Sequence, residues 1–471
     1  MYIKHFVIIT ILSITLSALE YEEARHLLSR TGFGGTPAEI DEILPLTYVE
    51  AVDKLLKQLG NGSVISAPEW TEERPQIKPR KNKALLQVMS EGQKREYRKL
   101  MRQKRRQKSV HLKMWWFKQM ITTDSPFTER MVLFFHNHFT SSFKKVKFPY
   151  LLYKQNMLFR KYITGNFREL TQMIAKDPAM ILYLDNQTNR KDKPNENFAR
   201  ELLELFTLGE GNYTEQDIKQ GARAFTGWMV NKKNGLFQFN KRQHDDGEKT
   251  FMDKSGNFNG SDIIDIVFQN PQVANYLVTK LWIEFISPTP DKEEVSRLAQ
   301  LFIDNDYEML PLLRALFLSS HFRTPTNYGK QIKSPVELIV GTVRMFKVHI
   351  TNHRQLVQYS KQLGQDLFDP PNVKGWPGGN EWITSHTLLA RRQMLERALR
   401  GSDMFLQRFW VWHYIDKNMK MSSWTGLGLQ EKEQKIQQLL LPVAPVNNIE
   451  KPKKLLPAIK NLVFDLSYQL K

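Results

Sequence analysis

The segment SPFTERMVLFFHNHFTSS, residues 125–142, indicates the fold class. Pro126 begins a helix, because proline suits the first helical position. The apolar residues that follow at helical spacing give this helix one side to bury. The helix ends at His136-Asn137-His138, so polar side chains come directly after a core segment. The segment therefore predicts a buried helix with functional groups at its end.

The same helical pattern continues outside this segment. Helices are expected over residues 262–268, 271–285, 291–305, 309–319 and 334–346. No alternating apolar and polar run is long enough for a substantial sheet, and residues 237–240 fit one strand of a small hairpin. The sequence predicts a mainly α, multi-helix globular domain over residues 19–400 with a small β-hairpin. Residues 401–471 are expected to form a C-terminal extension, because residues 442–457 have the Pro- and Lys-rich composition of a linker.

Residues 1–18 form an apolar segment of the secretory type. Lys4 precedes an apolar run over residues 6–12, and small residues follow at positions 17 and 18. The run is shorter than the roughly 20 apolar residues of a membrane-spanning helix, although a buried N-terminal helix or an uncleaved anchor would show a similar pattern. We therefore expect a signal peptide over residues 1–18. The protein is expected to be secreted or periplasmic, with no transmembrane span after signal removal.

The net charge of +19 is concentrated in one part of the 471-residue chain. Residues 78–108 contain thirteen Lys or Arg and only two Glu, which marks them as a basic insertion. Such a segment is either a solvated helix surface or a binding surface for an anionic envelope polymer. Nucleic acid is disfavoured as a partner, because Tyr97 is the only aromatic residue of the insertion that could stack on bases.

Cysteine is absent from the sequence. This excludes disulfides, zinc–thiolate sites, iron–sulfur clusters and thiol catalysis. A chain of this length can bury a large apolar core without disulfides.

The two histidines at the end of the opening segment are candidate metal ligands. Neutral imidazoles are the commonest metal ligands in proteins, and two His separated by one residue can converge on a turn. His136 and His138, together with Glu196, are therefore assigned to a site for a divalent metal ion. The alternative is structural, with one His capping a buried helix end and the other exposed.

A second polar segment, residues 195–209, begins with Asn-Glu-Asn and continues as a helix. The oxygen-rich side chains of Asn195 and Asn197 can orient a substrate hydroxyl or a cation at the start of this helix. A further candidate for ligand binding is Trp228, which follows the next predicted helix.

Charged side chains continue along the same helix. Arg200 lies four residues from both Glu196 and Glu204, so it can bridge two acids. Surface ion pairs would show the same spacing and contribute little to stability. Arg200 and the neighbouring Glu201 are assigned to a candidate catalytic group.

The loop HDDGEKT, residues 244–250, adds a candidate base. Asp246 can orient His244 as a general base or bind a metal, and Lys249 can hold an anion. The alternative is a charged surface loop. We assign His244, Asp246 and Lys249 to the candidate catalytic group.

Residues 368–383 contain three Pro, three Gly and two Trp, which predicts a rigid loop. Indole rings stack on sugars and cations. Lys374, Trp376 and Trp382 are therefore candidate ligand-binding residues. The alternative is a loop that covers the core with its two indoles.

Several motifs occur together in a fixed order, at residues 135–139, 195–202, 223–228, 244–250 and 370–379. They resemble the bacterial family named domain of unknown function 1800, as do residues 26–34 and 332–338, and the resemblance covers residues 22–397. The resemblance implies an exported or envelope-associated protein, often encoded beside a family similar to alkaline phosphatases and sulfatases. It implies no activity and no catalytic residues. Met252-Asp253 departs from the family, which more often has Leu-Gly there, and the basic insertion and the tail beyond about residue 400 are also departures.

Two functional hypotheses follow from these motifs. In the first, the candidate catalytic and metal-binding residues converge on one cleft that hydrolyses a phosphate, sulfate or glycosidic ester in the envelope. These residues are His136, His138, Glu196, Arg200, Glu201, His244, Asp246 and Lys249. In the second, the protein is a non-catalytic binder of an envelope polysaccharide, or a scaffold for a phosphatase- or sulfatase-like partner. The second hypothesis uses the Trp376/Trp382 loop and the basic insertion.

Overall fold

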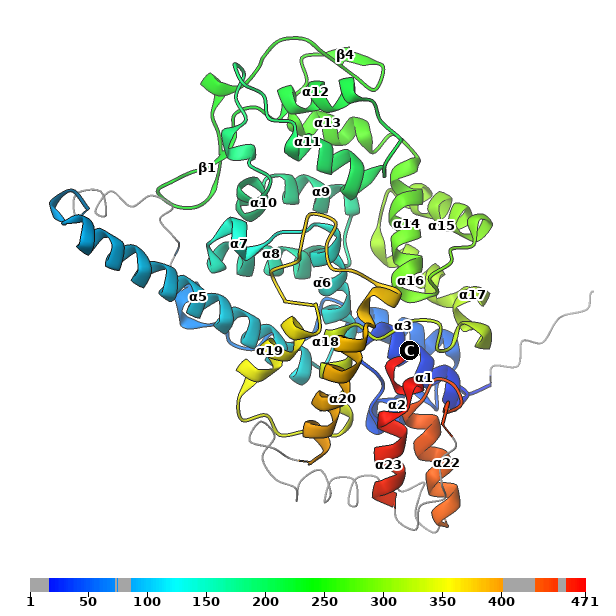
Figure 1. Ribbon diagram of the computed structural model, residues 1–471. Coiled ribbons are helices and arrows are strands. Elements are labelled where there is room, and N and C mark those ends of the chain that lie inside the picture. Colours follow the sequence, from blue (N-terminus) through cyan, green and yellow to red (C-terminus); the bar gives the residue numbers. More distant parts are fainter. Residues whose placement is uncertain (1–16, 73, 75–85, 401–427, 448–454) are drawn as a thin grey trace, which may run out of the picture.

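The computed structural model of the protein describes residues 17–72, 74, 86–400, 428–447 and 455–471 (Figure 1). Most of the expected signal peptide, the start of the basic insertion and the first part of the expected C-terminal extension lie outside these residues. Helices build most of the described chain, and the named strands form two hairpins. The mainly helical fold with a small hairpin that the sequence predicts is confirmed.

The N-terminal part of the chain, up to residue 183, consists of helices. They are α1 (Tyr21–Thr31), α2 (Pro37–Ile43), α3 (Tyr48–Gln58), η1 (Glu69–Thr71), α5 (Glu91–Thr122), α6 (Pro126–His138), α7 (Phe143–Val146), α8 (Pro149–Tyr162), α9 (Phe167–Ala175) and α10 (Pro178–Tyr183). The opening segment of the sequence forms α6, whose residues from Phe127 to His138 are buried with the exception of Asn137.

The middle of the chain combines short helices with the two hairpins. Its elements are η2 (Asn186–Thr188), α11 (Asn197–Glu201), the π-helical turn η3 (Leu202–Thr207), α12 (Glu215–Ala224), β1 (Trp228–Val230), β2 (Phe237–Phe239), η4 (Lys241–Gln243), β3 (Lys249–Phe251) and β4 (Lys254–Gly256). This region lies at one end of the molecule, shown in green in Figure 1.

The C-terminal part of the chain is helical again. Its elements are α13 (Gly260–Val267), α14 (Gln272–Phe285), α15 (Lys292–Asp304), α16 (Met309–Leu318), α17 (Ser320–Arg323), η5 (Pro325–Asn327), α18 (Pro335–Met345), α19 (His353–Gln362), η6 (Gly379–Trp382), α20 (Ser385–Arg400), α22 (Leu429–Leu440), α23 (Leu455–Phe464) and η8 (Leu466–Gln469). The five helices predicted between residues 262 and 346 correspond to α13, α14, α15, α16 and α18, with ends that agree within two residues.

Local capping explains this agreement. Asp291 accepts a hydrogen bond from Glu294 N at the start of α15. Ser334 and Glu337 form a reciprocal capping box around Pro335 at the start of α18. Such side chains satisfy the free N–H groups of a first turn, so they place the start of a helix from nearby residues alone.

The two hairpins are short and antiparallel. Trp228 pairs with Phe239 in the first hairpin, and Lys249 pairs with Gly256 in the second. The second hairpin turns through Met252 and Asp253, whose φ angles are 47° and 60°. Glycine adopts this left-handed conformation without a steric penalty. The departure from the family motif therefore places Asp253, a residue with a side chain, in a conformation that glycine adopts more easily.

One continuous apolar core runs from Leu19 to Tyr468 and includes residues of α22 and α23. The chain end is also held by backbone hydrogen bonds, from Lys333 N to Gln469 O at 2.7 Å and from Lys471 N to Gln331 O at 2.8 Å. The described residues of the tail beyond residue 400 therefore pack into the same core as the rest of the fold.

Helix α5 has two different halves. Trp115, Trp116 and Phe117 are buried in its C-terminal half, whereas the residues before Ser109 are exposed or half-buried. Figure 1 shows the exposed half extending away from the body of the molecule. Across the described part of the chain, no helix combines the length and the apolar character needed to cross a membrane.

Candidate functional site

A cavity of about 230 Å³ lies where α6, α14, the start of α18 and the loop around Trp376 meet, and we call it the Trp376 cavity. Its polar and aromatic lining residues are Arg130, Phe134, Asn137, Glu284, Lys330, Gln331, Ser334, Glu337, Gln365, Trp376, Asn380, Trp382 and Lys471. These residues come from segments that are far apart in the sequence. Three motifs of the sequence analysis, 135–139, 332–338 and 370–379, meet here.

Asn137 attaches the Trp376 loop to the end of α6. Its Oδ1 accepts a hydrogen bond from Trp376 N at 2.7 Å. Gly375 has a φ of 96°, and a Cβ at this position would lie 2.2 Å from Asn137 Oδ1. The loop therefore needs glycine at position 375 for its backbone conformation and for its close approach to Asn137. The indole N–H of Trp376 donates to Asp366 O at 3.1 Å and fixes the ring.

A network of buried ion pairs forms the floor of the cavity. The guanidinium of Arg130 lies 2.7 Å from Glu337 Oε1 and 2.5 Å from Glu284 Oε1. The ammonium of Lys471 pairs with the same carboxylate of Glu337. Burial alone would raise the pKa of Glu337, but Arg130 and Lys471 outweigh it and lower the pKa to about 2. Glu337 is therefore ionised. Its carboxylate also accepts a hydrogen bond from Ser334 N, at the start of its own helix.

The charges of the buried floor balance, and the additional cation among the described lining residues is Lys330, at the exposed rim of the cavity. Three cationic side chains line the cavity, Arg130, Lys330 and Lys471, against the two carboxylates of Glu284 and Glu337. Burial lowers the pKa of Lys471 to about 8, which shows how poorly this environment solvates a cation. An anion is therefore expected to bind at the rim, beside Lys330, rather than on the floor.

Two polar atoms of the lining residues are not satisfied. Arg130 Nε and Gln331 Oε1 are buried and have no hydrogen-bond partner among the residues that the structure describes. Leaving a buried donor or acceptor without a partner is costly. Both atoms have almost no accessible surface, so they add to the cost of the buried network and are not open to a ligand in the cavity.

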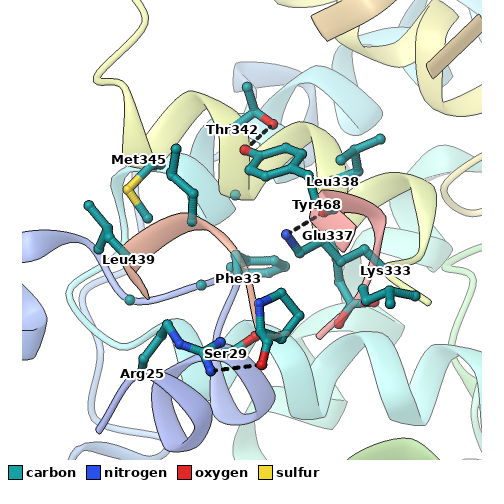
Figure 2. A pocket seen from close by; sticks show the side chains of 16 residues that line it. Arg25, Ser29, Phe33, Lys333, Glu337, Leu338, Thr342, Met345, Leu439 and Tyr468 are labelled. Carbon is teal, nitrogen blue, oxygen red and sulfur yellow. Dashed lines mark hydrogen bonds between the residues drawn. The ribbon is translucent and has the colours of Figure 1, made fainter. Parts of the chain in front are cut away.

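A smaller cavity of about 30 Å³ lies next to the first one, with Glu337 lining both (Figure 2). Lys333 donates to Tyr468 O at 2.7 Å and lies 4.1 Å from the centre of the Tyr468 ring. Burial lowers the pKa of Lys333 to about 7. A space of this size suits one or two water molecules rather than a ligand.

His136 and His138 lie in the core and face different partners. His136 Nε2 accepts from Asn156 Nδ2 at 3.1 Å, and its ring packs against Trp116. His138 Nε2 donates to Phe206 O at 3.0 Å, and its Nδ1 accepts from Lys280 at 3.3 Å. Burial, followed by the charges of Arg160 and Lys280 respectively, holds the pKa of both well below the usual range. Both histidines are therefore neutral.

The metal site expected from the sequence is not formed by these residues. Glu196 stands at the start of α11, where it pairs with Arg200 rather than with either histidine. Among the described residues, no group of three or more His, Asp or Glu side chains is arranged to hold a metal ion. The Nε2 of His136 is bonded to Asn156, and the Nε2 of His138 is bonded to Phe206 O. The two rings therefore face different partners and do not converge.

The residues at the start of α11 hold the local backbone. Asn195 Oδ1 accepts from Asn197 N at 3.0 Å, and Asn197 Nδ2 donates to Leu184 O at 3.0 Å. These bonds use the oxygen of Asn195 and the amide nitrogen of Asn197 to hold the backbone.

Arg200 bridges two acids, but one of them is not the acid that the spacing predicted. Its two terminal nitrogens each lie 2.8 Å from Glu215, and Glu196 lies at 3.3 Å. Glu204 instead accepts from Tyr213 OH at 2.9 Å. Burial, with a smaller contribution from Glu204, raises the pKa of Glu201.

The polar side chains of the 244–250 loop bond to the backbone of the loop and of a neighbouring segment. His244 Nδ1 donates to Thr226 O at 2.9 Å, while its Nε2 lies 4.0 Å from Asp246 Oδ1, too far for a hydrogen bond. Lys249 donates to Asp245 O at 2.6 Å and to Gly247 O at 2.8 Å. The loop is therefore organised around its own backbone.

Arg223, which the sequence analysis did not single out as a site residue, completes this loop by binding Asp245 through Nε at 2.7 Å. Trp228 is buried and packs edge-on against Phe225 and Phe237. Its environment is that of a core residue.

Of the predicted ligand-binding residues, the structure brings Trp376 and Trp382 to the cavity. Both indoles are 5% exposed, so they form a wall and also cover the core behind it. Lys374 is exposed and is not among the lining residues. Sequence reasoning missed Arg130, Gln331, Glu337 and Lys471. A charged residue inside the apolar run of α6 was the available signal for Arg130.

The comparison with protein families agrees with the sequence motifs. The model of the family described as "Protein of unknown function (DUF1800)" matches residues 26–465, so the chain belongs to this family. The match extends beyond the expected end at residue 397 and includes most of the tail. No curated protein and no solved structure matches the chain.

Proposed function

We propose that the protein binds an acidic saccharide of the cell envelope in the Trp376 cavity. The observation that carries this proposal is the meeting of an aromatic wall, formed by Trp376 and Trp382, with the exposed polar side chains of Lys330 and Asn380 in one cavity. Sugar hydroxyls both donate and accept hydrogen bonds, so one sugar can bond to these polar groups while its ring contacts the wall.

The wall and the charge of the cavity support the same class of ligand. Trp376 and Trp382 form an aromatic wall, and Ile283, which is 47% exposed, adds an apolar side chain. Such surfaces suit the apolar face of a sugar ring. The excess of cationic side chains suits a carboxylate or sulfate on that ring.

The size of the cavity limits the ligand. Its volume of about 230 Å³ is below the range of about 300–1,000 Å³ that is usual for ligand pockets. We therefore expect one sugar unit to enter, such as the end of a chain, rather than a long internal segment.

Hydrolysis of an envelope ester stays a prediction of the sequence analysis. The residues assigned to it are held apart, with His136 and His138 in the core and His244 in a separate loop. Binding without catalysis, with a phosphatase- or sulfatase-like partner acting on the bound chain, is the arrangement that the cavity supports better.

Calorimetric titration with matched sugars tests the proposal. Glucuronate and galactose-6-sulfate are each compared with glucose and galactose. Lys330 and Asn380 lie at the exposed rim, so Lys330→Gln and Asn380→Ala change the cavity without disturbing the core. Each substitution is expected to weaken the binding of the acidic sugars by about 3–10-fold, which is the effect of losing one hydrogen bond. The matched control Lys232→Gln, on an exposed lysine between β1 and β2, is expected to have less than about a twofold effect.

The titrations can also contradict the proposal. Equal affinity for acidic and neutral sugars would remove the role of the Lys330 charge. Equal losses in Lys330→Gln and Lys232→Gln would place the binding outside the cavity. Release of free sulfate from galactose-6-sulfate during the titration would instead support the hydrolase hypothesis.

A further inference from the structure

The exposed half of α5 is a second surface of distinct chemistry. We define this half, residues 91–108, as the outer helix. It contains nine Lys or Arg and two Glu. Arg95, Arg98, Arg102 and Arg106 are all exposed. Figure 1 shows that the outer helix extends away from the body, so its sides are open to a large partner.

The charges are dense and broadly distributed around the helix axis. Eighteen helical residues span about 27 Å, so the outer helix carries about one positive charge per 3 Å of length. With 100° between successive residues, the nine cations cover roughly 220° of the circumference. The outer helix is therefore a cationic rod.

The positive charges are left largely uncompensated by the protein itself. Among the described residues, the ion pair formed by the outer helix joins Lys94 to Glu91 at 2.8 Å. Arg98 and Arg102 lie four residues apart, as do Lys104 and Lys108, and like charges at this spacing destabilise a helix. An anionic partner would relieve this repulsion, so binding and helix stability are coupled.

The base of the outer helix is fixed to the body. The Lys108 ammonium lies 5.8 Å from the centre of the Trp70 ring, and the Arg105 guanidinium lies 6.0 Å from that of Phe148. Ser109 begins the buried half of α5. The cationic rod therefore has a defined position relative to the rest of the protein.

The pattern of side chains distinguishes between kinds of anionic partner. A helix that lies in a membrane surface needs an apolar side, and in the outer helix the exposed large apolar residue is Leu100. Binding of single-stranded nucleic acid relies on stacked aromatic side chains, and the outer helix contains only Tyr97. A flexible anionic chain needs neither feature and can follow charges that spread around a rod.

We propose that the outer helix is the docking site of a linear anionic polysaccharide, bound along the helix through its carboxylates or sulfates. This proposal rests on the charges and the placement of α5 and does not depend on the Trp376 cavity.

Binding of heparin and of polygalacturonate to the full chain tests the proposal. The test variant carries Arg95→Gln, Arg98→Gln, Arg102→Gln and Arg106→Gln, because Gln keeps the helix propensity and removes the charge. The control variant carries Lys232→Gln, Lys233→Gln, Lys241→Gln and Arg242→Gln, which removes the same charge from exposed positions around the first hairpin. Circular dichroism and thermal melting confirm that both variants are folded.

The expected results separate the two variants. At about 0.1 M salt the test variant loses at least tenfold in affinity for either polysaccharide, and the control loses less than threefold. The slope of log affinity against log salt is expected to become shallower by about 3 in the test variant. The reason is that each of the four lost contacts releases roughly 0.7–0.9 counterions. Lys330→Gln changes the cavity and not the outer helix, so it is expected to leave the affinity for either polysaccharide within twofold. Failure of this proposal and failure of the proposed function are therefore distinguishable.

Three outcomes would overturn the proposal. Equal losses in the test and control variants would show that net charge alone drives the binding. Tighter binding to phosphatidylglycerol vesicles than to the polysaccharides, abolished in the test variant, would identify a membrane surface as the partner. Tighter binding to duplex DNA, abolished in the same way, would identify nucleic acid.

Discussion

The Trp376 cavity and the region from Asn195 to Phe251 contain the same kinds of side chain but use them differently. In the 195–251 region, Arg200, Arg223 and Lys249 have their partners within the region itself. In the cavity, Lys330 and Asn380 are exposed beside the indoles of Trp376 and Trp382. Polar residues that satisfy one another stabilise local structure, whereas exposed polar groups beside an aromatic wall are available to a ligand. The comparison therefore supports the proposal that the cavity is the binding site.

The largest expected effect comes from Glu337, on which the cavity floor depends. Glu337→Ala leaves Arg130 and Lys471 without their shared carboxylate, and breaking a buried pair in this way costs about 3–5 kcal/mol. Denaturant unfolding measures this loss. A loss below about 1 kcal/mol would contradict the assignment of Glu337 as the centre of the floor.

The second effect depends on pH and concerns Lys333, beside the cavity. Burial lowers the pKa of Lys333 from about 10.4 in the unfolded chain to about 7 in the folded protein. Between these values the unfolded chain binds the additional proton, so this residue makes stability rise with pH from about 7 to about 10. Below pH 7 both states are protonated, and the folded state carries the full cost of the buried charge.

Lys333→Met removes this dependence. The stability of the variant relative to the natural protein is expected to be higher at pH 6 than at pH 9 by about 2 kcal/mol. Unfolding curves at the two pH values measure the difference. A difference that does not change with pH would show that Lys333 keeps an ordinary pKa, and the environment around the floor would then solvate cations well.

A smaller effect is expected in the 195–251 region. Arg223→Met removes two hydrogen bonds to the carboxylate of Asp245 and is expected to cost about 1–2 kcal/mol of stability. The affinity for acidic sugars should not change. If Arg223→Met weakened sugar binding as much as Lys330→Gln does, the 195–251 region and the cavity would share one site. The distinction between the two regions would then be wrong.

The smallest effect is expected at Arg200. Its partner Glu215 has a side chain that is 66% exposed, so the ion pair is screened by solvent. Arg200→Met is expected to cost less than about 1 kcal/mol, as is usual for surface ion pairs. A melting curve checks this value. A larger loss, together with loss of sugar binding, would return Arg200 to the candidate site.

The sequence predicts the helices better than it predicts the site, and the reason is the range of the interactions. The start of α18 depends on Ser334, Pro335 and Glu337, which are neighbours in the chain. The site depends on contacts such as the one between Asn137 and Trp376, which are 239 residues apart. Spacing along the chain contains no information about such a contact.

The motif at the end of α6 shows the same limit. The metal hypothesis is based on the residue types of His136 and His138. In the structure both rings are buried in the core, and Asn137 is the residue that lines the cavity. Which side of a helix end faces a distant loop is decided by tertiary packing. Arg200 is a second case, because its spacing predicts Glu204 as a partner while the fold brings Glu215 closer.

A crystal structure with the acidic sugar that binds most tightly in the titrations tests the central claim most directly. We predict that the sugar ring lies in the Trp376 cavity, with its acidic group within hydrogen-bonding distance of Lys330 and a hydroxyl within hydrogen-bonding distance of Asn380. An ordered sugar on the 195–251 region, with the Trp376 cavity empty, would contradict the account.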